Sequence, residues 1–581
     1  MPATRMNTPP AAGSRPWLRN YPGGLDWHAS LAKCPVHRIL DETAAAWPDR
    51  VAIEFEGQAH TYRSLRDMAD RAAAGLRRLG VGPGIQVGLY LPNTPHYAVM
   101  FFAILKAGGT VVNYSPLDAA NVVRHKIADS ETDIIVTLDL ASLYPLMDEM
   151  LGATRLRCLV VGTLAEMSGG ATDAAPARIA DIAWNDARLR FSDLLAGDAL
   201  PVAPAEIDVD TAVAVLQYTG GTTGLPKGAM LTHGNLSAAV SQALVNTGGS
   251  DGLRPGEEIF LCVLPLFHIY ALTFNLLLAV RLAARSLLHM RFDPERVIAE
   301  IGDRKVTVFF GVPTMFTALN ACASLDRADF GSLRFCNSGG APLAADVGER
   351  FHRVTGQRVQ EGWGMTETCG VGTITPRGVT GPPGACGIPL CGVDIRFLDV
   401  NDPQRYVAYG ERGEICVAGP NVLRGYWKKP EATAESMTAD GYFRTGDVGS
   451  MDDNGFLTIA DRIKDMLLCG GFNVYPRAIE EAIYRHPSVA EVIVIGVADA
   501  YRGQHPKAYI RLRDGAAPFT LDELKVFLKD ALGKHEMVHS MELRDALPKT
   551  PVGKLSKKEL YQEEQDRAAA NASNPITKET T

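Results

Sequence analysis

The stretch Tyr218-Thr-Gly-Gly-Thr-Thr-Gly-Leu-Pro-Lys227-Gly228 is a glycine- and hydroxyl-rich turn that ends in a lysine. Its glycines can adopt positive φ angles and bring the backbone close to an anion. Successive N–H groups and the hydroxyls of Thr219, Thr222 and Thr223 can then point at phosphate oxygens, and the ammonium of Lys227 adds a mobile positive charge. This segment predicts a site for the triphosphate tail of a nucleotide.

The order of residues in this turn differs from that of the common phosphate loop. Kinases and GTPases use G-x-x-x-x-G-K-[ST]. Here Lys227 follows a proline, precedes Gly228 and has no adjacent Ser or Thr that could hold magnesium. A Walker-type kinase is therefore disfavoured. A plain surface turn between a strand at 212–217 and a helix from about Asn235 is the alternative explanation of the turn by itself.

Strand-like and helix-like patterns alternate along the chain before the turn. Strands are expected at 51–55, 86–91 and 110–113, and helices at 62–79 and 97–106. Such alternation is typical of parallel sheets covered by helices, so the predicted class is α/β. The Ala-, Gly- and Asp-rich piece at 165–205 predicts a surface excursion.

The length of 581 residues predicts two to four structural units. We expect a leader at 1–30 and a large domain at 31–462 that includes a small β-barrel-like subdomain. A smaller α+β domain at 463–565 would follow on a hinge, with helices at 478–486 and 521–532 and strands at 491–497 and 507–512. The polar tail at 566–581 is expected to be disordered.

Composition excludes several classes of protein. Hydrophobic residues make up 46% and charged residues 21%, as in a globular enzyme, and the net charge of −8 gives no general attraction to nucleic acid. Ten cysteines without a C-x-x-C pair indicate neither zinc nor a disulfide framework and favour the reducing cytosol. The uncharged run 259–280 is long enough to cross a bilayer, but Pro265, His268 and Asn275 interrupt it, which favours a buried strand and helix.

Two further segments carry groups that suit a nucleotide. In Asn337-Ser-Gly-Gly-Ala-Pro-Leu343 a strand turns through two glycines, where a flat base could lie near the backbone, before a helix that begins at Pro342. In Glu361-Gly-Trp363-Gly-Met-Thr366-Glu367 the indole ring can stack on adenine, the hydroxyl can donate to phosphate, and the Glu367 carboxylate can hold Mg2+. A strand end with a buried tryptophan and a solvated glutamate is the alternative.

These motifs are followed, in order, by Tyr442-Phe-Arg-Thr445-Gly446-Asp447, Asp461-Arg462 and Leu547-Pro-Lys549-Thr-Pro-Val-Gly-Lys554. Together they resemble the signatures of the acyl-adenylate-forming superfamily over residues 30–560. The segments at 17–22, 217–221, 267–273 and 471–476 are most similar to those of bacterial long-chain fatty-acid CoA ligases. The family usually has Tyr where Trp363 stands. Some long-chain enzymes place a gating Trp about four residues after the position of His268, where this chain has Leu272.

The resemblance implies roles for particular residues. The catalytic residues it implies are Lys554, Glu367, Thr366 and His268, with Thr222 and Glu367 as metal ligands. The nucleotide contacts it implies are Thr219, Gly220, Gly221, Thr222, Thr223, Gly224, Lys227, Gly339, Gly340, Ala341, Trp363, Gly364, Asp447 and Arg462. It places a hinge at Lys464 and a CoA tunnel at Gly470, Gly471 and Phe472.

The implied reaction is that of an acid–thiol ligase. With ATP and Mg2+, a medium- to long-chain fatty acid would first be activated to acyl-AMP with release of pyrophosphate. The acyl group would then be transferred to CoA, and AMP would be released. Between Ile259 and Phe292 there is no Asp or Glu, and this absence favours an uncharged, apolar acid. An aryl-acid ligase similar to coumarate-CoA ligase and a fatty acyl-AMP ligase that loads a carrier protein are the alternatives. We expect a cytoplasmic monomer or homodimer, with peripheral contact at the inner face of the membrane as the most extensive membrane association.

Overall fold

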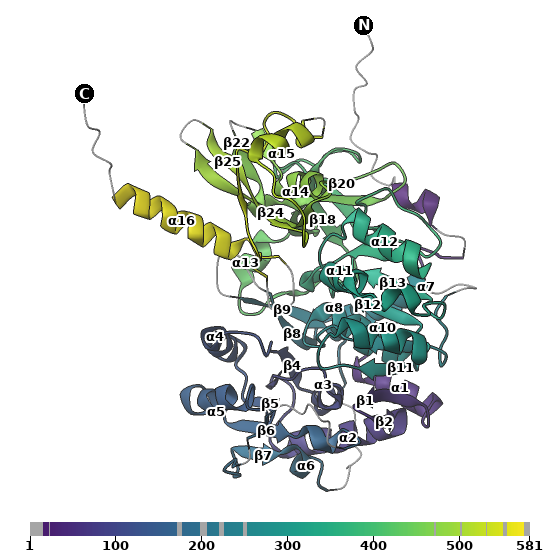
Figure 1. Ribbon diagram of the computed structural model, residues 1–581. Helices are drawn as coiled ribbons and strands as arrows, with labels where there is room; N and C mark the ends of the chain where they lie inside the picture. Colours follow the sequence, from purple (N-terminus) through teal and green to yellow (C-terminus); the bar gives the residue numbers. More distant parts are fainter. Residues whose placement is uncertain are drawn as a thin grey trace.

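The computed structural model (Figure 1) describes residues 15–21, 24–170, 177–179, 181–197, 206–219, 226–247, 252–469, 472–499, 502–529, 531–549 and 555–573. Two large mixed sheets with helices lie in the N-terminal part, and a smaller sheet with its own helices forms the C-terminal part (Figure 1). The predicted α/β class is confirmed.

The phosphate turn follows a central strand of an eight-stranded sheet, whose order is β19-β9-β8-β4-β3-β5-β6-β7. The strands from β8 to β7 are parallel, whereas β9 runs antiparallel to β8. Helices α2 (Tyr62–Arg78) and α3 (Pro95–Ala107) pack on each other, and α3 also packs on β3 and β4. The strands are β3 (Gln86–Leu89), β4 (Thr110–Asn113), β5 (Ile134–Leu138), β6 (Cys158–Gly162), β7 (Arg188–Arg190), β8 (Val213–Thr219), β9 (Lys227–Thr232) and β19 (Gly425–Tyr426).

Part of the expected surface excursion belongs to this sheet. Strand β7 pairs with β6, and α6 (Phe191–Leu194) buries two apolar side chains, so the prediction for 165–205 is wrong at 188–194. The physical reason is that Phe191 and Leu194 are buried in the core. Because many Ala, Gly and Asp residues surround them, the composition of the segment did not indicate these two core positions.

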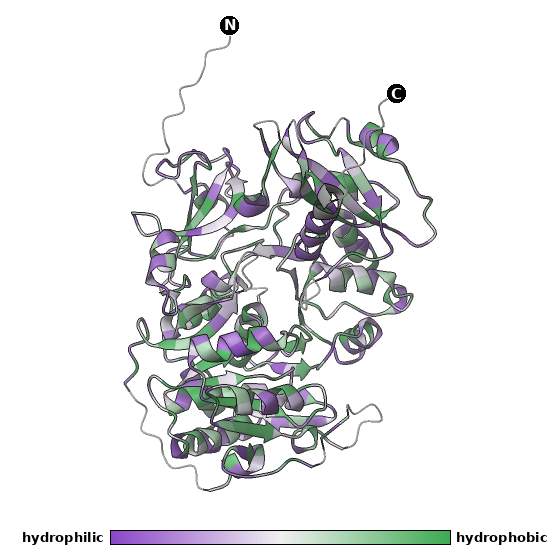
Figure 2. Cartoon of the chain, turned by 90° about the vertical axis from the view of Figure 1, so that its left-hand side faces the viewer, coloured by the Kyte–Doolittle hydropathy of each residue, from purple (hydrophilic) through white to green (hydrophobic). Residues whose placement is uncertain are grey.

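The second large sheet has nine strands in the order β16-β15-β14-β13-β12-β10-β11-β1-β2. Its central strands are parallel and largely buried, and hydrophobic colour dominates many strands of both large sheets in Figure 2. Among its helices, α10 (Pro294–Asp303), α11 (Pro313–Ala321) and α12 (Ala345–Thr355) pack in series. The strands are β1 (Val51–Phe55), β2 (Gln58–Thr61), β10 (Ile259–Cys262), β11 (Arg285–Leu288), β12 (Val308–Gly311), β13 (Phe335–Ser338), β14 (Gln360–Trp363), β15 (Thr373–Ile374) and β16 (Ile388–Pro389).

The apolar run 259–280 forms a buried strand followed by helix, as expected. After β10 come α8 (Ile269–Ala271), the π-helix η3 (Leu272–Leu278) and α9 (Ala279–Arg281). The π-helical segment was not predicted; it is packed against α7 (His233–Thr247). Within the described ranges, no helix combines the length and apolarity needed to cross a bilayer.

A four-stranded antiparallel sheet forms the small subdomain, in the order β17 (Asp394–Leu398), β18 (Gly413–Ala418), β20 (Phe443–Met451) and β21 (Leu457–Arg462). The chain from residue 15, within the range expected as a leader, packs on it. Trp17 is fully buried with its ring edge-on to Tyr409, and Arg15 pairs with Asp394 at 2.7 Å. Burying this indole ties the segment to the domain.

The C-terminal part is an α+β unit. A sheet in the order β23-β22-β25-β24, with β26 beside β25, carries α14 (Pro476–Tyr484) and α15 (Leu521–Leu528). Its strands are β22 (Leu467–Cys469), β23 (Phe472–Val474), β24 (Val489–Asp499), β25 (Gly503–Leu512) and β26 (Ser540–Leu543).

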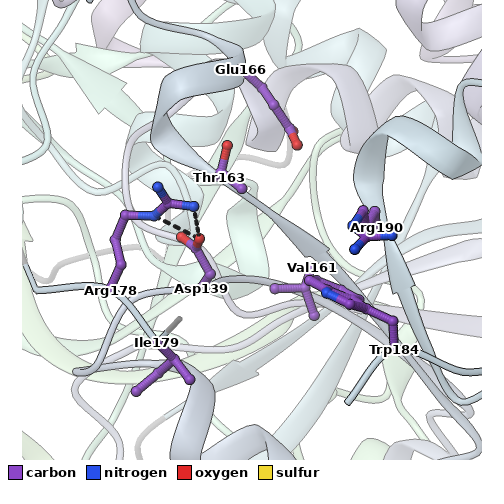
Figure 3. Close-up of a pocket in the computed structure, with 8 residues that line it drawn as sticks. All are labelled: Asp139, Val161, Thr163, Glu166, Arg178, Ile179, Trp184 and Arg190. Atoms are coloured by element: carbon purple, nitrogen blue, oxygen red, sulfur yellow. Dashed lines mark hydrogen bonds and ion pairs between the residues drawn. The ribbon is translucent and has the colours of Figure 1, made fainter. Parts of the chain in front are cut away.

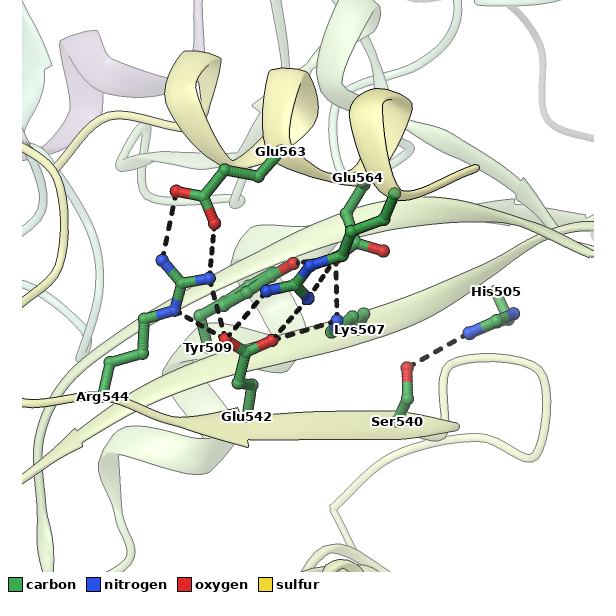
Figure 4. A network of polar contacts seen from close by, with 9 residues as sticks. His505, Lys507, Tyr509, Ser540, Glu542, Arg544, Glu563 and Glu564 are labelled. Atoms are coloured by element: carbon green, nitrogen blue, oxygen red, sulfur yellow. Dashed lines mark hydrogen bonds and ion pairs between the residues drawn. The ribbon is translucent and has the colours of Figure 1, made fainter. Parts of the chain in front are cut away.

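A charged network fastens the last helix, α16 (Lys558–Ser573), to this sheet (Figure 4). Glu542 on β26 pairs with Arg567 at 2.8 Å, with Arg544 at 2.8 Å and with Lys507 at 3.2 Å. Tyr509 donates its hydroxyl to Glu564 at 2.6 Å. These contacts hold the part of α16 up to Arg567, and the helix runs on to Ser573, within the range where a disordered tail was expected.

We expect Glu542→Gln to destabilise this network in a pH-dependent way. The hydrogen bond from Arg567, and then those from Arg544 and Lys507, lower the pKa of Glu542 from 4.5 to about 2. The contribution of the ionised Glu542 carboxylate to the free energy of unfolding is therefore complete above pH 4.5, and it is lost as the pH falls towards 2. After allowance for solvent screening, urea unfolding of the full chain at pH 6 should show a loss of about 1–2 kcal/mol.

At pH 3.5 the difference between Glu542→Gln and the parent should be smaller. Glu149→Gln is the control, because Glu149 makes a single exposed pair with Arg124. A loss that is equal at both pH values would contradict the assignment.

Candidate functional site

The two ends of the phosphate turn lie side by side. Strands β8 and β9 pair with Thr219 opposite Lys227, and the Thr219 hydroxyl lies 3.5 Å from the Lys227 carbonyl oxygen. The predicted contacts Gly220, Gly221, Thr222, Thr223 and Gly224 fall outside the described residues. The antiparallel ladder therefore closes the turn and places an exposed ammonium at its end.

Helix α4 (Ala120–Ser130) braces the turn from its flank. Tyr218 donates its hydroxyl to Asp129 at 2.7 Å, and His125 Nε2 lies 3.1 Å from the carbonyl oxygen of Pro226. No motif pointed to these two side chains of α4, because they lie about 90 to 100 residues away from their partners in the chain.

Glu367 lies in the short helix η5 (Thr366–Thr368), directly after β14, and its side chain is buried. Burial raises the pKa of its carboxyl, while a hydrogen bond from the Tyr426 hydroxyl, 2.8 Å from Oε1, opposes the rise. Lys227 Nζ lies 5.3 Å from the centre of the same tyrosine ring. The predicted metal ligand and the phosphate lysine thus meet at one aromatic side chain.

The chemistry of Glu367 suits a hard divalent cation, since carboxylate oxygen is a preferred ligand of Mg2+. Within the described ranges, no group of three or more His, Cys, Asp or Glu side chains could enclose a metal. Mg2+ held by one or two carboxylates usually takes further ligands from substrate phosphates.

Trp363, Asp447 and Arg462 form a hydrogen-bonded cluster. The indole Nε1 of Trp363 donates to Asp447 Oδ2 at 2.9 Å, and Arg462 Nε lies 3.1 Å from Asp447 Oδ1. Asp447 and Arg462 face each other across β20 and β21, and Asp447 is buried. Beside Trp363, a Cβ on Gly364 would come within 2.5 Å of the Gly370 carbonyl oxygen, so this position requires glycine.

The second glycine motif lies at the carboxyl end of β13, next to β14. Tyr270 donates its hydroxyl to Asn337 at 2.5 Å, and its ring packs on Gly339, where a Cβ would approach within 3.0 Å. Gly340 has φ +81°. Of the predicted contacts Gly339, Gly340 and Ala341, Gly339 therefore packs on the buried ring of Tyr270, and the other two come directly after it in the chain. The next helix, α12, begins at Ala345 rather than at Pro342.

The apolar segment 264–274 lies within the run that favours an apolar acid, and we call it the acyl wall. Buried amide side chains hold it in place. Asn93 donates to the Leu264 carbonyl at 2.9 Å and accepts from the Leu266 N–H at 2.8 Å. Gln217, on the strand that leads to the phosphate turn, donates to the Phe267 carbonyl at 3.0 Å. His268 is half-buried beside them and caps α8, where Nδ1 accepts from the Tyr270 N–H at 3.4 Å. The wall and the phosphate strand are therefore joined directly.

The C-terminal unit contacts the same region. Asp461, at the end of β21, accepts from the Arg477 N–H in the first turn of α14 at 2.8 Å. Lys464 follows in η6 (Ile463–Asp465), and its pKa is lowered by partial desolvation and then by the Arg462 cation.

Three predicted residues of this unit, Gly470, Gly471 and Lys554, lie outside the described ranges. Lys549 and Leu555 pair across the loop that contains Lys554. Phe472 is 59% exposed, with its ring centre 5.0 Å from that of His535 in the same unit, so it does not line a buried channel in this conformation.

A separate cavity of about 420 Å³ lies at the carboxyl ends of β5 and β6 (Figure 3). Asp139 and Arg178 pair on one side of it, and Arg190 lies over the ring of Trp184 on the other. The cavity contains none of the predicted site residues.

Comparison with known proteins agrees with this geometry. The model of the AMP-binding enzyme family matches residues 40–427, and that of the AMP-binding enzyme C-terminal domain matches 478–554. A long-chain-fatty-acid–CoA ligase of Bacillus subtilis (strain 168) is 34% identical over 558 residues, which cover 95% of this chain and 98% of that protein. A feruloyl-CoA synthase of Amycolatopsis sp is 35% identical over 531 residues, covering 91% and 98%.

Solved structures show the same architecture. ATP-bound MatB from Rhodopseudomonas palustris has a TM-score of 0.80 at 28% identity, covering 91% of this chain and 99% of that one. The o-succinylbenzoate CoA synthetase MenE from Bacillus subtilis, in complex with the acyl-adenylate intermediate OSB-AMP, has a TM-score of 0.74 at 27% identity, covering 92% and 98%. The chain belongs to the family of AMP-binding, adenylate-forming enzymes.

Proposed function

We propose that this protein is a fatty acid–CoA ligase. It activates a medium- to long-chain fatty acid with ATP to acyl-AMP and pyrophosphate, and it then transfers the acyl group to CoA with release of AMP. The observation that carries the proposal is the meeting of Lys227 and Glu367 at Tyr426, because it joins a phosphate-binding cation to a metal-binding carboxylate beside an apolar wall.

In the first step a carboxylate oxygen of the acid attacks the α-phosphorus of ATP, and pyrophosphate leaves. Lys227 and the hydroxyls of Thr219, Thr222 and Thr223 bind the departing phosphates, and Thr366 donates to the α-phosphate. Lys554 brings a positive charge to the α-phosphate and the substrate carboxylate, where negative charge gathers in the transition state. Glu367 and Thr222 hold Mg2+, which when bound neutralises phosphate charge.

The nucleoside is held by the neighbouring cluster. Asp447 accepts from the ribose hydroxyls, Arg462 orients this carboxylate, and the ring of Trp363 lies against adenine. The backbone at Gly339, Gly340 and Ala341 lines the other side of the base. Preorganised groups of this kind need no rearrangement at the moment of reaction, which is what makes them effective.

In the second step the CoA thiol attacks the acyl-AMP carbonyl and AMP leaves. We place the hinge at Lys464, between units at 31–462 and 463–565. Few described side chains bridge these units, among them Arg513 with Asp346 at 2.7 Å and Arg477 with Asp461. Rotation about the hinge withdraws Lys554 and brings Gly470, Gly471 and Phe472 to the channel for the thiol.

The acid is proposed to be aliphatic and apolar because the wall from Leu264 to Phe274 contains no charged side chain. His268 closes its carboxylate end. An aryl acid is the second candidate, favoured by the relative named feruloyl-CoA synthase. AMP release with ATP, Mg2+ and CoA, measured across fatty acids of increasing length and across benzoate, coumarate and ferulate, decides between them. Turnover confined to the aryl acids would overturn the fatty-acid assignment.

Lys554→Ala should abolish adenylate formation but spare thiol transfer. We expect the rate of acid-dependent pyrophosphate exchange to fall by at least about a hundredfold, because an oriented charge at the transition state is lost. Thioester formation from added acyl-AMP and CoA should stay within about twofold of the parent, since Lys554 is withdrawn in that step. Lys558→Ala is the control, because Lys558 is an exposed lysine at the start of α16. Equal loss of both half-reactions would contradict this division.

Trp363→Phe should weaken ATP binding. It keeps an aromatic ring but removes the indole N–H from the buried Asp447 carboxylate, and a hydrogen bond to a charged group typically changes affinity by about tenfold. Isothermal titration calorimetry measures the change.

Trp27→Phe is matched to this variant, because Trp27 is also buried and also donates its indole N–H, here to the Val393 carbonyl, outside the site. Equal ATP affinity for Trp363→Phe and Trp27→Phe would refute the role of the Trp363 N–H.

A further inference from the structure

Tyr426 touches both charged groups at the centre of the candidate site, although no motif identified it. Its hydroxyl donates to Glu367 Oε1 at 2.8 Å, and Lys227 Nζ lies 5.3 Å from the centre of its ring. One half-buried phenol therefore offers a neutral donor to the carboxylate and a π face to the ammonium.

The backbone on both sides fixes the position of Tyr426. Strand β19 pairs with β9 so that Tyr426 lies opposite Ala229, and the Trp427 N–H donates to the Gly228 carbonyl at 2.8 Å. Three residues earlier, the Leu423 N–H donates to the Glu367 carbonyl at 2.7 Å. The backbone around Tyr426 is thus hydrogen-bonded to β9, which follows the phosphate turn, and to Glu367.

Lys227 and Glu367 carry opposite charges, and the first lies near the Tyr426 ring while the second accepts from its hydroxyl. In the part of the chain that the structure describes, neither residue forms an ion pair within 4.0 Å. Opposite charges attract strongly where water is partly excluded. If they paired, the ammonium would be less available to phosphate and the carboxylate less available to a cation.

We infer that Tyr426 is a positioning residue that keeps Lys227 and Glu367 from pairing with each other. Its ring holds the ammonium for the phosphates of ATP, and its hydroxyl holds one carboxylate oxygen so that the other can take the divalent cation. This inference rests on the proposed function, because ATP and Mg2+ are the ligands that the two charges serve.

Two substitutions separate the contributions of the hydroxyl and the ring. Tyr426→Phe removes the donor to Glu367 and keeps the π face, whereas Tyr426→Leu removes both. Tyr406→Phe is a matched control: the Tyr406 hydroxyl donates to Asp440 at 2.7 Å, and Arg396 lies 5.4 Å from its ring. These control contacts belong to the small subdomain, outside the candidate site.

The measurement is the dissociation constant of ATP by calorimetry, once with Mg2+ and once with EDTA, for the full chain. Tyr426→Phe should weaken binding of MgATP by about tenfold and leave metal-free ATP within about twofold, because it disturbs the carboxylate alone. Tyr426→Leu should weaken both forms by about tenfold, since the ammonium loses its ring and can pair with Glu367. Paramagnetic resonance of Mn2+ with ATP should show the same weakening of metal binding in both variants.

Equal affinities for MgATP in Tyr426→Phe and Tyr406→Phe would overturn the inference. So would a loss in Tyr426→Phe that is the same with and without metal, because a merely structural defect would act on both forms. If the parent protein itself binds no MgATP and releases no AMP with any acid, the proposed function fails instead.

Discussion

The antiparallel pairing of β8 with β9, at one end of an otherwise parallel run, is the constraint on which the site depends. A parallel neighbour would need a long crossover, whereas the antiparallel return brings Lys227 back opposite Thr219 within a short turn. Strand β9 then pairs with β19, and that pairing places Tyr426 against Glu367, a residue that follows β14 of the other large sheet. One local reversal of direction thus joins the phosphate turn to the metal carboxylate.

Buried carboxylates are the second organising feature. Glu367 and Asp447 are both buried, and each accepts a hydrogen bond from an aromatic side chain, Tyr426 or Trp363. A carboxylate removed from water without such partners would be costly. The aromatic donors hold each carboxylate in one orientation. Because water is partly excluded around the carboxylates, their interactions with a ligand are also stronger. The aromatic donors therefore serve stability and preorganisation together.

The C-terminal unit is stabilised largely by contacts of its own. Its own core and the network around Glu542 are internal to it, whereas its bonds to the large part include the Asp461 contact with α14 and the exposed pair of Arg513 with Asp346. Ion pairs hold α16 to β25 and β26.

The sequence by itself determined the α/β class, the order of the motifs and the family, because these depend on local periodicity and on glycine, hydroxyl and charged residues at short spacing. It predicted the buried strand and helix at 259–280 for the same reason. Only the tertiary structure decided that Trp17 and Phe191 are core residues, that Arg567 fastens α16, and that Tyr426 connects Lys227 with Glu367. Those contacts join residues far apart in the chain, and strand order and register, which no local pattern encodes, bring them together.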